Sequence, residues 1–135
     1  MPLEAAGARL KVHSHADPFV ADLDGDLTWD LIVGAGDGSV AWFRNEGTPK
    51  APAFAAALEL VAAKSDTDSV ARQADAAGAP LPATRAQICV ADHDRDGRMD
   101  LIVGDYARPG ATTKGKTSYV WLYRRAGPTT PSARR

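Results

Sequence analysis

Short apolar runs, separated by acidic or glycine-containing segments, recur along the chain. Residues 31–33 are Leu-Ile-Val and residues 88–90 are Ile-Cys-Val, so neither alternating set of side chains in these runs is polar. Because side chains of a strand point alternately to the two faces of a sheet, both faces of these strands are predicted to be covered. The pattern therefore predicts sheets that stack on neighbouring sheets.

The strand pattern occurs twice. Residues 20–34, VADLDGDLTWDLIVG, align without gaps on residues 90–104, VADHDRDGRMDLIVG, with ten of the fifteen positions identical. A second match pairs residues 40–44 with residues 120–124, so the second copy holds ten extra residues within the segment Tyr106 to Ser118. That segment is predicted to be an exposed loop, and each copy is predicted to fold as strand, acidic loop, strand, turn and strand.

Two segments between the copies allow alternative predictions. Residues 53–61 form a fourth strand of the first copy or, because they are rich in alanine, a helix. Residues 65–78 form a short helix that starts at a capping box of Ser65 and Asp68, or an irregular linker. The second copy repeats three strands only, and the tail at residues 127–135 is predicted to be disordered.

Composition and charge narrow the classes of function. The chain has 135 residues, 44% hydrophobic and 24% charged, which is the size and balance of one globular domain or part of one. Its formal net charge of −1 gives no electrostatic reason to expect nucleic acid or an anionic membrane as partner. No apolar run reaches the length of a membrane span, and residues 1–10 lack the features of a secretory signal.

The single cysteine, Cys89, excludes an intramolecular disulfide. It lies in the apolar run of residues 88–91, where we expect a buried structural thiol. No histidine and asparagine are placed to support a role as nucleophile.

Each copy carries four aspartates, at positions 1, 3, 5 and 9 of the loop between its first two strands. Four carboxylates in so short a segment repel one another unless a cation lies among them. Calcium prefers about six to eight oxygen ligands, and a curled loop offers them from alternate side chains and from the carbonyl at position 7. The predicted ligands are Asp22, Asp24, Asp26, Thr28 and Asp30 in the first loop, and Asp92, Asp94, Asp96, Arg98 and Asp100 in the second.

Other kinds of site fit the loops less well. The absence of cysteine and histidine at these spacings argues against zinc, and magnesium demands a stricter octahedron. An EF-hand needs glutamate at position 12, where the copies have Val33 and Val103 within runs of strand formers. A solvated acidic turn is the competing interpretation, but two copies in the same frame favour a calcium loop that joins two strands.

Residues 18–45 follow the pattern P-F-V-A-D-x-D-G-D-x-x-x-D-L-I-V-G-x-G-D-G-S-V-x-W-F-R-N. This pattern is similar to the FG-GAP/VCBS repeat of integrin-α-like β-propellers. Residues 88–124 resemble the same repeat with a longer hairpin. The resemblance implies an all-β fold of antiparallel propeller blades, here two blade-like repeats of a partial propeller. It also implies structural Ca²⁺ held by the loop residues named above. The localisation is open, although the family resemblance implies a secreted or periplasmic setting.

Two features depart from the family pattern. The family has glycine at loop position 6, which Gly97 provides and Leu27 does not. A non-glycine residue in a left-handed conformation there costs about 1–2 kcal/mol, so the first loop is expected to bind calcium more weakly. Two repeats are also too few to close a ring.

The predicted organisation has five segments. They are residues 1–17 as an N-terminal strand that completes a neighbouring blade, residues 18–64 as blade repeat 1, residues 65–86 as a linker, residues 87–126 as blade repeat 2, and residues 127–135 as the tail. Within the first segment, residues 8–14 are the candidate strand for the second repeat of another chain. We therefore expect either self-association or association with the other blades of a parent propeller.

Two classes of function remain. The first is a calcium-stabilised module for protein or carbohydrate interaction, with no catalytic residue, and it is the class that we expect. The second is a fragment of a calcium-dependent propeller enzyme, a lyase or a hydrolase. Its candidate residues are His13, His15, Asp37 and Asp105. Trp29, Trp42 and Trp121 are candidates for a sugar platform, but at strand positions they are expected to pack instead.

Overall fold

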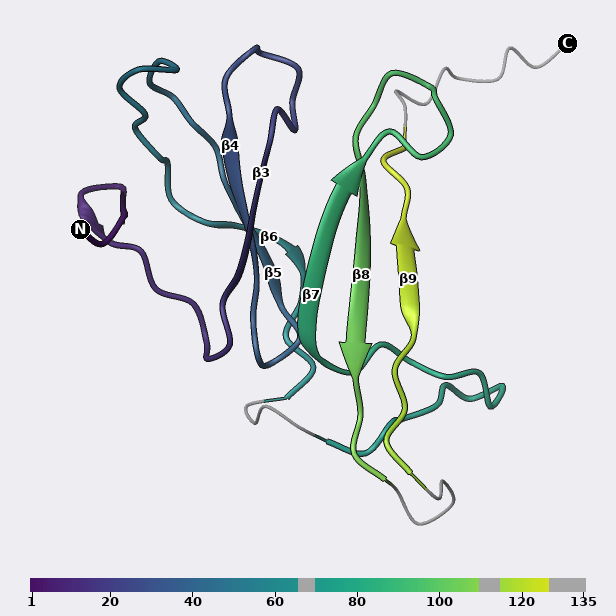
Figure 1. Cartoon of the computed structure of the whole chain (residues 1–135). Helices are drawn as coiled ribbons and strands as arrows, with labels where there is room; N and C mark the ends of the chain where they lie inside the picture. Colours follow the sequence, from purple (N-terminus) through teal and green to yellow (C-terminus); the bar gives the residue numbers. More distant parts are fainter. Residues whose placement is uncertain (66–69, 110–114, 127–135) are drawn as a thin grey trace, which may run out of the picture.

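The computed structural model describes residues 1–65, 70–109 and 115–126, and these residues form an all-β fold (Figure 1). All of the described strands except the two of a short N-terminal hairpin belong to two antiparallel sheets, one for each copy of the repeat. The described residues contain no helix, and hence none that is long and apolar enough to cross a membrane. The predicted fold class, antiparallel sheets stacked as blades, is confirmed.

Sheet 1 is built from the first repeat. Its four strands follow the order of the sequence: β3 (Asp17–Ala21), β4 (Asp30–Gly34), β5 (Val40–Phe43) and β6 (Leu58–Val61). Each strand pairs antiparallel with the next. The strand prediction for residues 53–61 is confirmed over β6, where Leu58 pairs with Trp42 and Val61 pairs with Val40. Val61 is buried in the core because β6 pairs with β5.

Sheet 2 is built from the second repeat. Its three strands are β7 (Thr84–Ala91), β8 (Asp100–Tyr106) and β9 (Val120–Tyr123), again in sequence order. As predicted, the described chain supplies no fourth strand to this sheet. Strand β9 therefore forms an edge of sheet 2, at the right of Figure 1.

The two sheets pack face to face through a hydrophobic junction. The buried side chains of the junction are Ala21, Leu23, Ile32, Val40 and Val61 from the first repeat, and Ala86, Ile88, Val90, Leu101 and Val103 from the second. Trp42 and Trp121 pack against this cluster as predicted, whereas Trp29 is exposed, so the three tryptophans form no common surface. The backbones approach closely at Gly34, where a Cβ atom would lie 2.2 Å from the carbonyl oxygen of Ala86.

The N-terminal segment lies on the other face of sheet 1. A short hairpin of β1 (Glu4–Ala5) and β2 (Ala8–Arg9) leads into Leu10 and Val12, which pack against the cluster of Leu31, Val33 and Phe43. Of residues 8–14, only the first two form a strand, and they pair within the hairpin. Within one chain, the segment therefore covers sheet 1 and does not pair with β9.

The described part of the linker, from residue 70 onward, is attached to sheet 2 and contains no helix. The helix considered for residues 65–78 is absent from the described part, where Ala71 instead bridges to Arg108. The side chain of Arg72 anchors the linker by donating two hydrogen bonds to Asp105. Several predictions lie outside the described residues, namely the capping partner Asp68, residues 110–114 of the inserted loop, and the disordered tail at residues 127–135.

Cys89 is exposed, so the prediction of a buried thiol is wrong. In β7 the buried positions alternate, and the neighbours Ile88 and Val90 are the residues that reach the junction. Cys89 points to the opposite face of sheet 2. The apolar run concealed this orientation because both of its alternating sets are apolar.

Candidate metal centres

The first acidic loop joins β3 to β4 and is folded around the carboxylate of Asp22. Its Oδ1 accepts the N–H groups of Gly25 and Asp26 at 2.8 and 3.0 Å, and its Oδ2 accepts the N–H of Leu27 at 3.0 Å. These hydrogen bonds curl the backbone into a tight loop. As a result, Asp22, Asp24 and Asp26 each place one carboxylate oxygen within 4.8 Å of the others.

The second loop, between β7 and β8, repeats this geometry. The carboxylate of Asp92 accepts the N–H groups of Asp96 and Gly97, both at 3.0 Å. Asp92, Asp94 and Asp96 again each offer an oxygen within 4.8 Å of the others. Loop positions 1, 3 and 5 thus converge in both repeats, as the spacing predicts.

The aspartate at position 9 lies in a different environment. Asp30 is fully buried, and its two oxygens accept the N–H groups of Leu23 and Asn45 at 3.2 and 2.8 Å. Asp100 accepts the two equivalent N–H groups at 3.3 and 2.9 Å. Each of these aspartates ties the start of its loop to the end of the third strand. Neither belongs to the convergent group, so their role as metal ligands stays a prediction.

The residues at position 7 contact the aspartate at position 5. The N–H and hydroxyl of Thr28 donate to Asp26 Oδ1 at 2.9 and 2.6 Å. The N–H of Arg98 donates to Asp96 Oδ1 at 2.9 Å, and its guanidinium forms a salt bridge with the same carboxylate. Position 7 therefore orients one carboxylate of each group. The contribution of its carbonyl to a metal remains a prediction.

An arginine that follows the third strand reaches each group of aspartates. Arg44 Nε lies 2.6 Å from Asp24 Oδ2, and Arg124 forms a salt bridge with Asp94, the equivalent carboxylate. Sequence reasoning did not assign these arginines to the loops. The signal was present, because the two arginines align in the repeat.

Hydrogen bonds lower the pKa of one carboxylate in each loop. The hydroxyl of Thr28 is the main cause of a lowered pKa at Asp26. At Asp94 the hydrogen bond from Arg124 is the main cause of a lowered pKa. Ionised carboxylates are the form that binds a divalent cation, so Asp26 and Asp94 each present a charged oxygen ligand at neutral pH.

Each loop has two left-handed backbone positions. At position 6, Leu27 has φ of 70° and Gly97 has φ of 82°, so the expected strain at Leu27 is present. At position 4 the order is reversed, with φ of 83° at Gly25 and 60° at Arg95. Because each loop places one larger residue in a left-handed conformation, strain does not rank the two sites. The sequence difference between Leu27 and Gly97 at position 6 did not show that Arg95, at position 4 of the second loop, carries a similar strain.

The donor set fits a hard cation. The atoms that converge are carboxylate oxygens, which calcium prefers, and neither group in the described chain includes a thiolate or an imidazole. The same set recurs in the two repeats. This arrangement can hold a metal ion that cross-links the loop between two strands.

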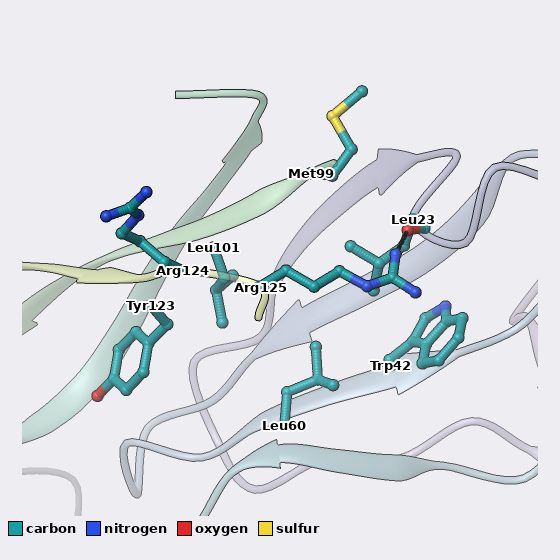
Figure 2. Close-up of a pocket in the computed structure, with 8 residues that line it drawn as sticks. All are labelled: Leu23, Trp42, Leu60, Met99, Leu101, Tyr123, Arg124 and Arg125. Atoms are coloured by element: carbon teal, nitrogen blue, oxygen red, sulfur yellow. Dashed lines mark hydrogen bonds between the residues drawn. The ribbon is translucent and has the colours of Figure 1, made fainter. Parts of the chain in front are cut away.

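A small cavity lies at the junction, close to the loops. Its volume is about 220 Å³ and its lining comes from both sheets: Leu23, Trp42, Leu60, Met99, Leu101, Tyr123, Arg124 and Arg125. In Figure 2, Arg125 extends from sheet 2 to the carbonyl oxygen of Leu23, to which it donates a hydrogen bond. The indole N–H of Trp42 is buried and finds no acceptor among the described residues. The walls are mainly apolar, so the cavity is a feature of the junction packing.

The candidates for catalysis lie at the other ends of the strands. His15 and Asp105 line one cleft of about 380 Å³, together with Arg85 and Tyr106. Asp37 lies in the turn before β5, where it accepts the N–H and hydroxyl of Ser39 at 2.9 and 2.7 Å. His13 is exposed.

Asp105 is buried and its oxygens are occupied. It accepts hydrogen bonds from the guanidinium of Arg72, the N–H groups of Ala83 and Tyr119, and the indole of Trp121. Burial alone would raise the pKa of Asp105, but these hydrogen bonds outweigh it and the pKa is lowered. The group is therefore an ionised hydrogen-bond acceptor, which is poorly suited to donate a proton.

A family model described as FG-GAP-like repeat matches residues 22–103, which is more than half of the 135 residues. The chain belongs to the FG-GAP-like repeat family. The matched range contains both acidic loops, and FG-GAP-like repeats are propeller blades, so sheets 1 and 2 are two blades of a partial propeller. No curated protein and no solved structure matches the chain.

Proposed function

We propose that this FG-GAP-like protein is a calcium-binding propeller module that acts by binding a protein or a carbohydrate, and that its calcium is structural. The observation that carries the proposal is the convergence of three carboxylates at the same positions of both loops. A solvated acidic turn would not need to repeat this arrangement in a second copy. The repeat therefore favours a common ligand for the two loops.

The proposed ligands follow the loop positions. They are the carboxylates of Asp22, Asp24, Asp26, Asp92, Asp94 and Asp96, with Asp30, Asp100 and the carbonyls of Thr28 and Arg98 as further ligands. Bound calcium supplies positive charge that offsets the repulsion among the carboxylates. The chain itself orients these groups through the hydrogen bonds to Asp22 and Asp92, and it anchors each loop to the third strand through position 9.

The preference for an interaction module over an enzyme rests on how the carboxylates are used. The loop aspartates are explained by a metal, and Asp105 is explained by its four donor groups. The enzyme alternative rests on the cleft that His15 shares with Asp105. A lyase or hydrolase activity lost in His15→Ala, with an unchanged melting temperature, would favour that alternative.

Thermal unfolding in millimolar calcium and in EDTA tests the proposal. Binding to the native state alone stabilises it by about 2.7 kcal/mol at a hundredfold excess of calcium over Kd, which raises the melting temperature by several degrees. Calorimetric titration should give two sites per chain, and one site in each of Asp24→Asn and Asp94→Asn. Glu59→Gln is the control, because it removes an exposed carboxylate from β6, outside both loops. Equal melting temperatures with and without calcium would overturn the proposal.

A further inference from the structure

One apolar face of sheet 2 is left uncovered by the described chain. The face points away from the junction and carries Cys89, Ile102, Val120 and Leu122; we call it the outer face of sheet 2. Val120 is 75% exposed and Leu122 is 42% exposed. Contiguous apolar side chains of this kind on a sheet usually mark an interaction surface.

The repeat shows what covers the equivalent face of sheet 1. Ile32 and Val40 are the counterparts of Ile102 and Val120, and both are 0% exposed because sheet 2 packs on them. The covering side chains of sheet 2 are Ile88, Val90, Leu101 and Val103. The same positions are therefore buried in an interface in the first repeat, whereas in the second Ile102 is half-buried and Val120 is exposed.

A glycine shared by the repeats supports this comparison. A Cβ atom on Gly34 would lie 2.2 Å from the carbonyl oxygen of Ala86, so glycine is required for sheet 2 to approach. Gly104 occupies the equivalent position on the outer face, where a Cβ atom would meet Gln87 alone, at 3.8 Å or more. Nothing within the described chain requires glycine at this position. The outer face thus has the feature that allows close approach of another sheet.

A second copy of the chain offers the matching surface. The face of sheet 1 opposite the junction carries Leu31 and Val33, which align with Leu101 and Val103 of the covering face and are the same residue types. Phe43 lies beside them, as Tyr123 does in sheet 2. The contact between the sheets inside one chain can therefore be repeated between two chains.

In one chain this face of sheet 1 is occupied by the N-terminal segment, residues 1–12, which we call the cover. The cover contacts the face through Ala5, Leu10 and Val12, while its other residues are exposed. Phe54, from the segment before β6, also packs at this face. It is also incomplete, since Val20 on this face is 58% exposed whereas the equivalent Val90 in sheet 2 is 7% exposed. A cover of this kind substitutes only in part for a second sheet.

We propose that the outer face of sheet 2 binds a second copy of this chain, head to tail, on the face of sheet 1 that carries Leu31 and Val33. The cover of the second copy moves aside when the sheets dock, and it therefore limits association. A head-to-tail contact uses two different surfaces, so it can propagate into a ring or an open chain. The inference rests on packing and is independent of calcium binding.

Sedimentation velocity of the full chain over a range of concentrations tests the proposal, in calcium and in EDTA. The double variant Leu10→Asn, Val12→Asn loosens the cover, and Lys11→Asn is the matched control because this exposed residue lies between the two contacts. By increasing the open fraction, the double variant should lower the apparent Kd of self-association by about tenfold or more, whereas the control should not. Adding Gly104→Val should return the double variant to a monomer.

Gly104→Val is chosen because, among the described residues, nothing lies closer than 3.8 Å to a Cβ atom at position 104, so the fold should persist. Cys89 gives a second readout, since it is the single cysteine and is exposed on the same face. Its reaction with a maleimide should slow as the chain associates. Association that survives Gly104→Val would overturn the proposal, because the contact would then not use the outer face. Association that Gly104→Val abolishes but that is the same with and without a loosened cover would also overturn it, and would indicate a symmetric contact between two outer faces.

A folded double variant that stays monomeric at the highest concentration would also overturn the proposal. If the double variant does not fold, hydrogen exchange on the unmodified chain replaces it. With rising concentration, amides of the cover should exchange faster and Cys89 should become protected. No change in either would reject the head-to-tail contact.

Discussion

Arg72 and Asp105 form a buried, two-point ion pair that joins the linker to sheet 2. Arg72 Nη2 lies 2.7 Å from Asp105 Oδ1, and Nη1 lies 2.8 Å from Oδ2. The guanidinium also stacks on Tyr119, with 4.1 Å from its carbon to the ring centroid. These contacts hold the linker at Arg72 beside β9 of sheet 2. Substitution of either partner therefore tests how much this attachment contributes to stability.

Removing one partner of this pair should destabilise the protein strongly. Arg72→Met leaves the Asp105 carboxylate buried without its counter-ion, which is expected to lower the free energy of unfolding by about 3–5 kcal/mol. Urea unfolding at neutral pH measures the change. Arg44→Met, which breaks the half-exposed pair with Asp24, is the control and should have little effect in EDTA. Equal changes in the free energy of unfolding for the two substitutions would show that the buried pair contributes no more to stability than the half-exposed pair.

Acid should weaken the fold through Asp105. Its pKa in the folded protein is lowered from the ordinary 3.8, because hydrogen bonds from Arg72 and neighbouring N–H groups outweigh the effect of burial. A carboxyl group with a lowered folded pKa contributes stability that is complete above its unfolded pKa and is lost as the pH falls through its folded pKa. The free energy of unfolding should therefore be level near neutral pH and fall below about pH 4.

One variant tests whether Asp105 causes the loss of stability in acid. Asp105→Asn should be less stable than the unmodified chain at neutral pH, and its stability should fall less steeply in acid. Asp26 and Asp94, whose pKa values are also lowered, contribute to the remaining slope. An unchanged slope in Asp105→Asn would exclude this residue as the cause.

The two junction tryptophans should respond differently to loss of the indole N–H. Trp121 Nε1 donates to Asp105 Oδ2 at 2.6 Å, so Trp121→Phe leaves a buried carboxylate short of a donor and should cost about 1–3 kcal/mol. Trp42 Nε1 has no acceptor among the described residues, so Trp42→Phe removes an unsatisfied buried group and should cost less. Denaturant unfolding compares them directly. A larger loss in Trp42→Phe would mean that its N–H has a partner, such as an ordered water.

The strain in the two loops should be relieved to a similar extent by glycine. Leu27→Gly and Arg95→Gly each remove a side chain from a left-handed position, and each should stabilise the protein by about 1 kcal/mol in EDTA. Gly97→Ala is the converse control. Among the residues that the structure describes, nothing lies within 4 Å of a Cβ atom at position 97, so any loss reflects the backbone conformation. Stabilisation by Leu27→Gly but not by Arg95→Gly would restore the original ranking of the sites.

The sequence alone determined the repeat, the order of strands within each sheet and the acidic loops. These features are local, since strand periodicity, turn residues and carboxylate spacing all act within a few positions. The loop position of Leu27 also predicted its left-handed backbone, because the aligned residue is Gly97. The need for stacked sheets followed from strands that are apolar on both faces.

The tertiary structure decided which of those apolar faces are covered. Ile32 and Ile102 are equivalent in sequence, yet only Ile32 is fully buried, because a second sheet packs on the first repeat and none in the described chain packs on the outer face of the second. The exposure of Cys89 has the same cause. The pairing of Arg72 with Asp105 joins residues 33 positions apart, and no local pattern encodes it. Burial depends on which surfaces contact each other in the folded protein. The sequence pattern indicates only which surfaces are apolar enough to be buried.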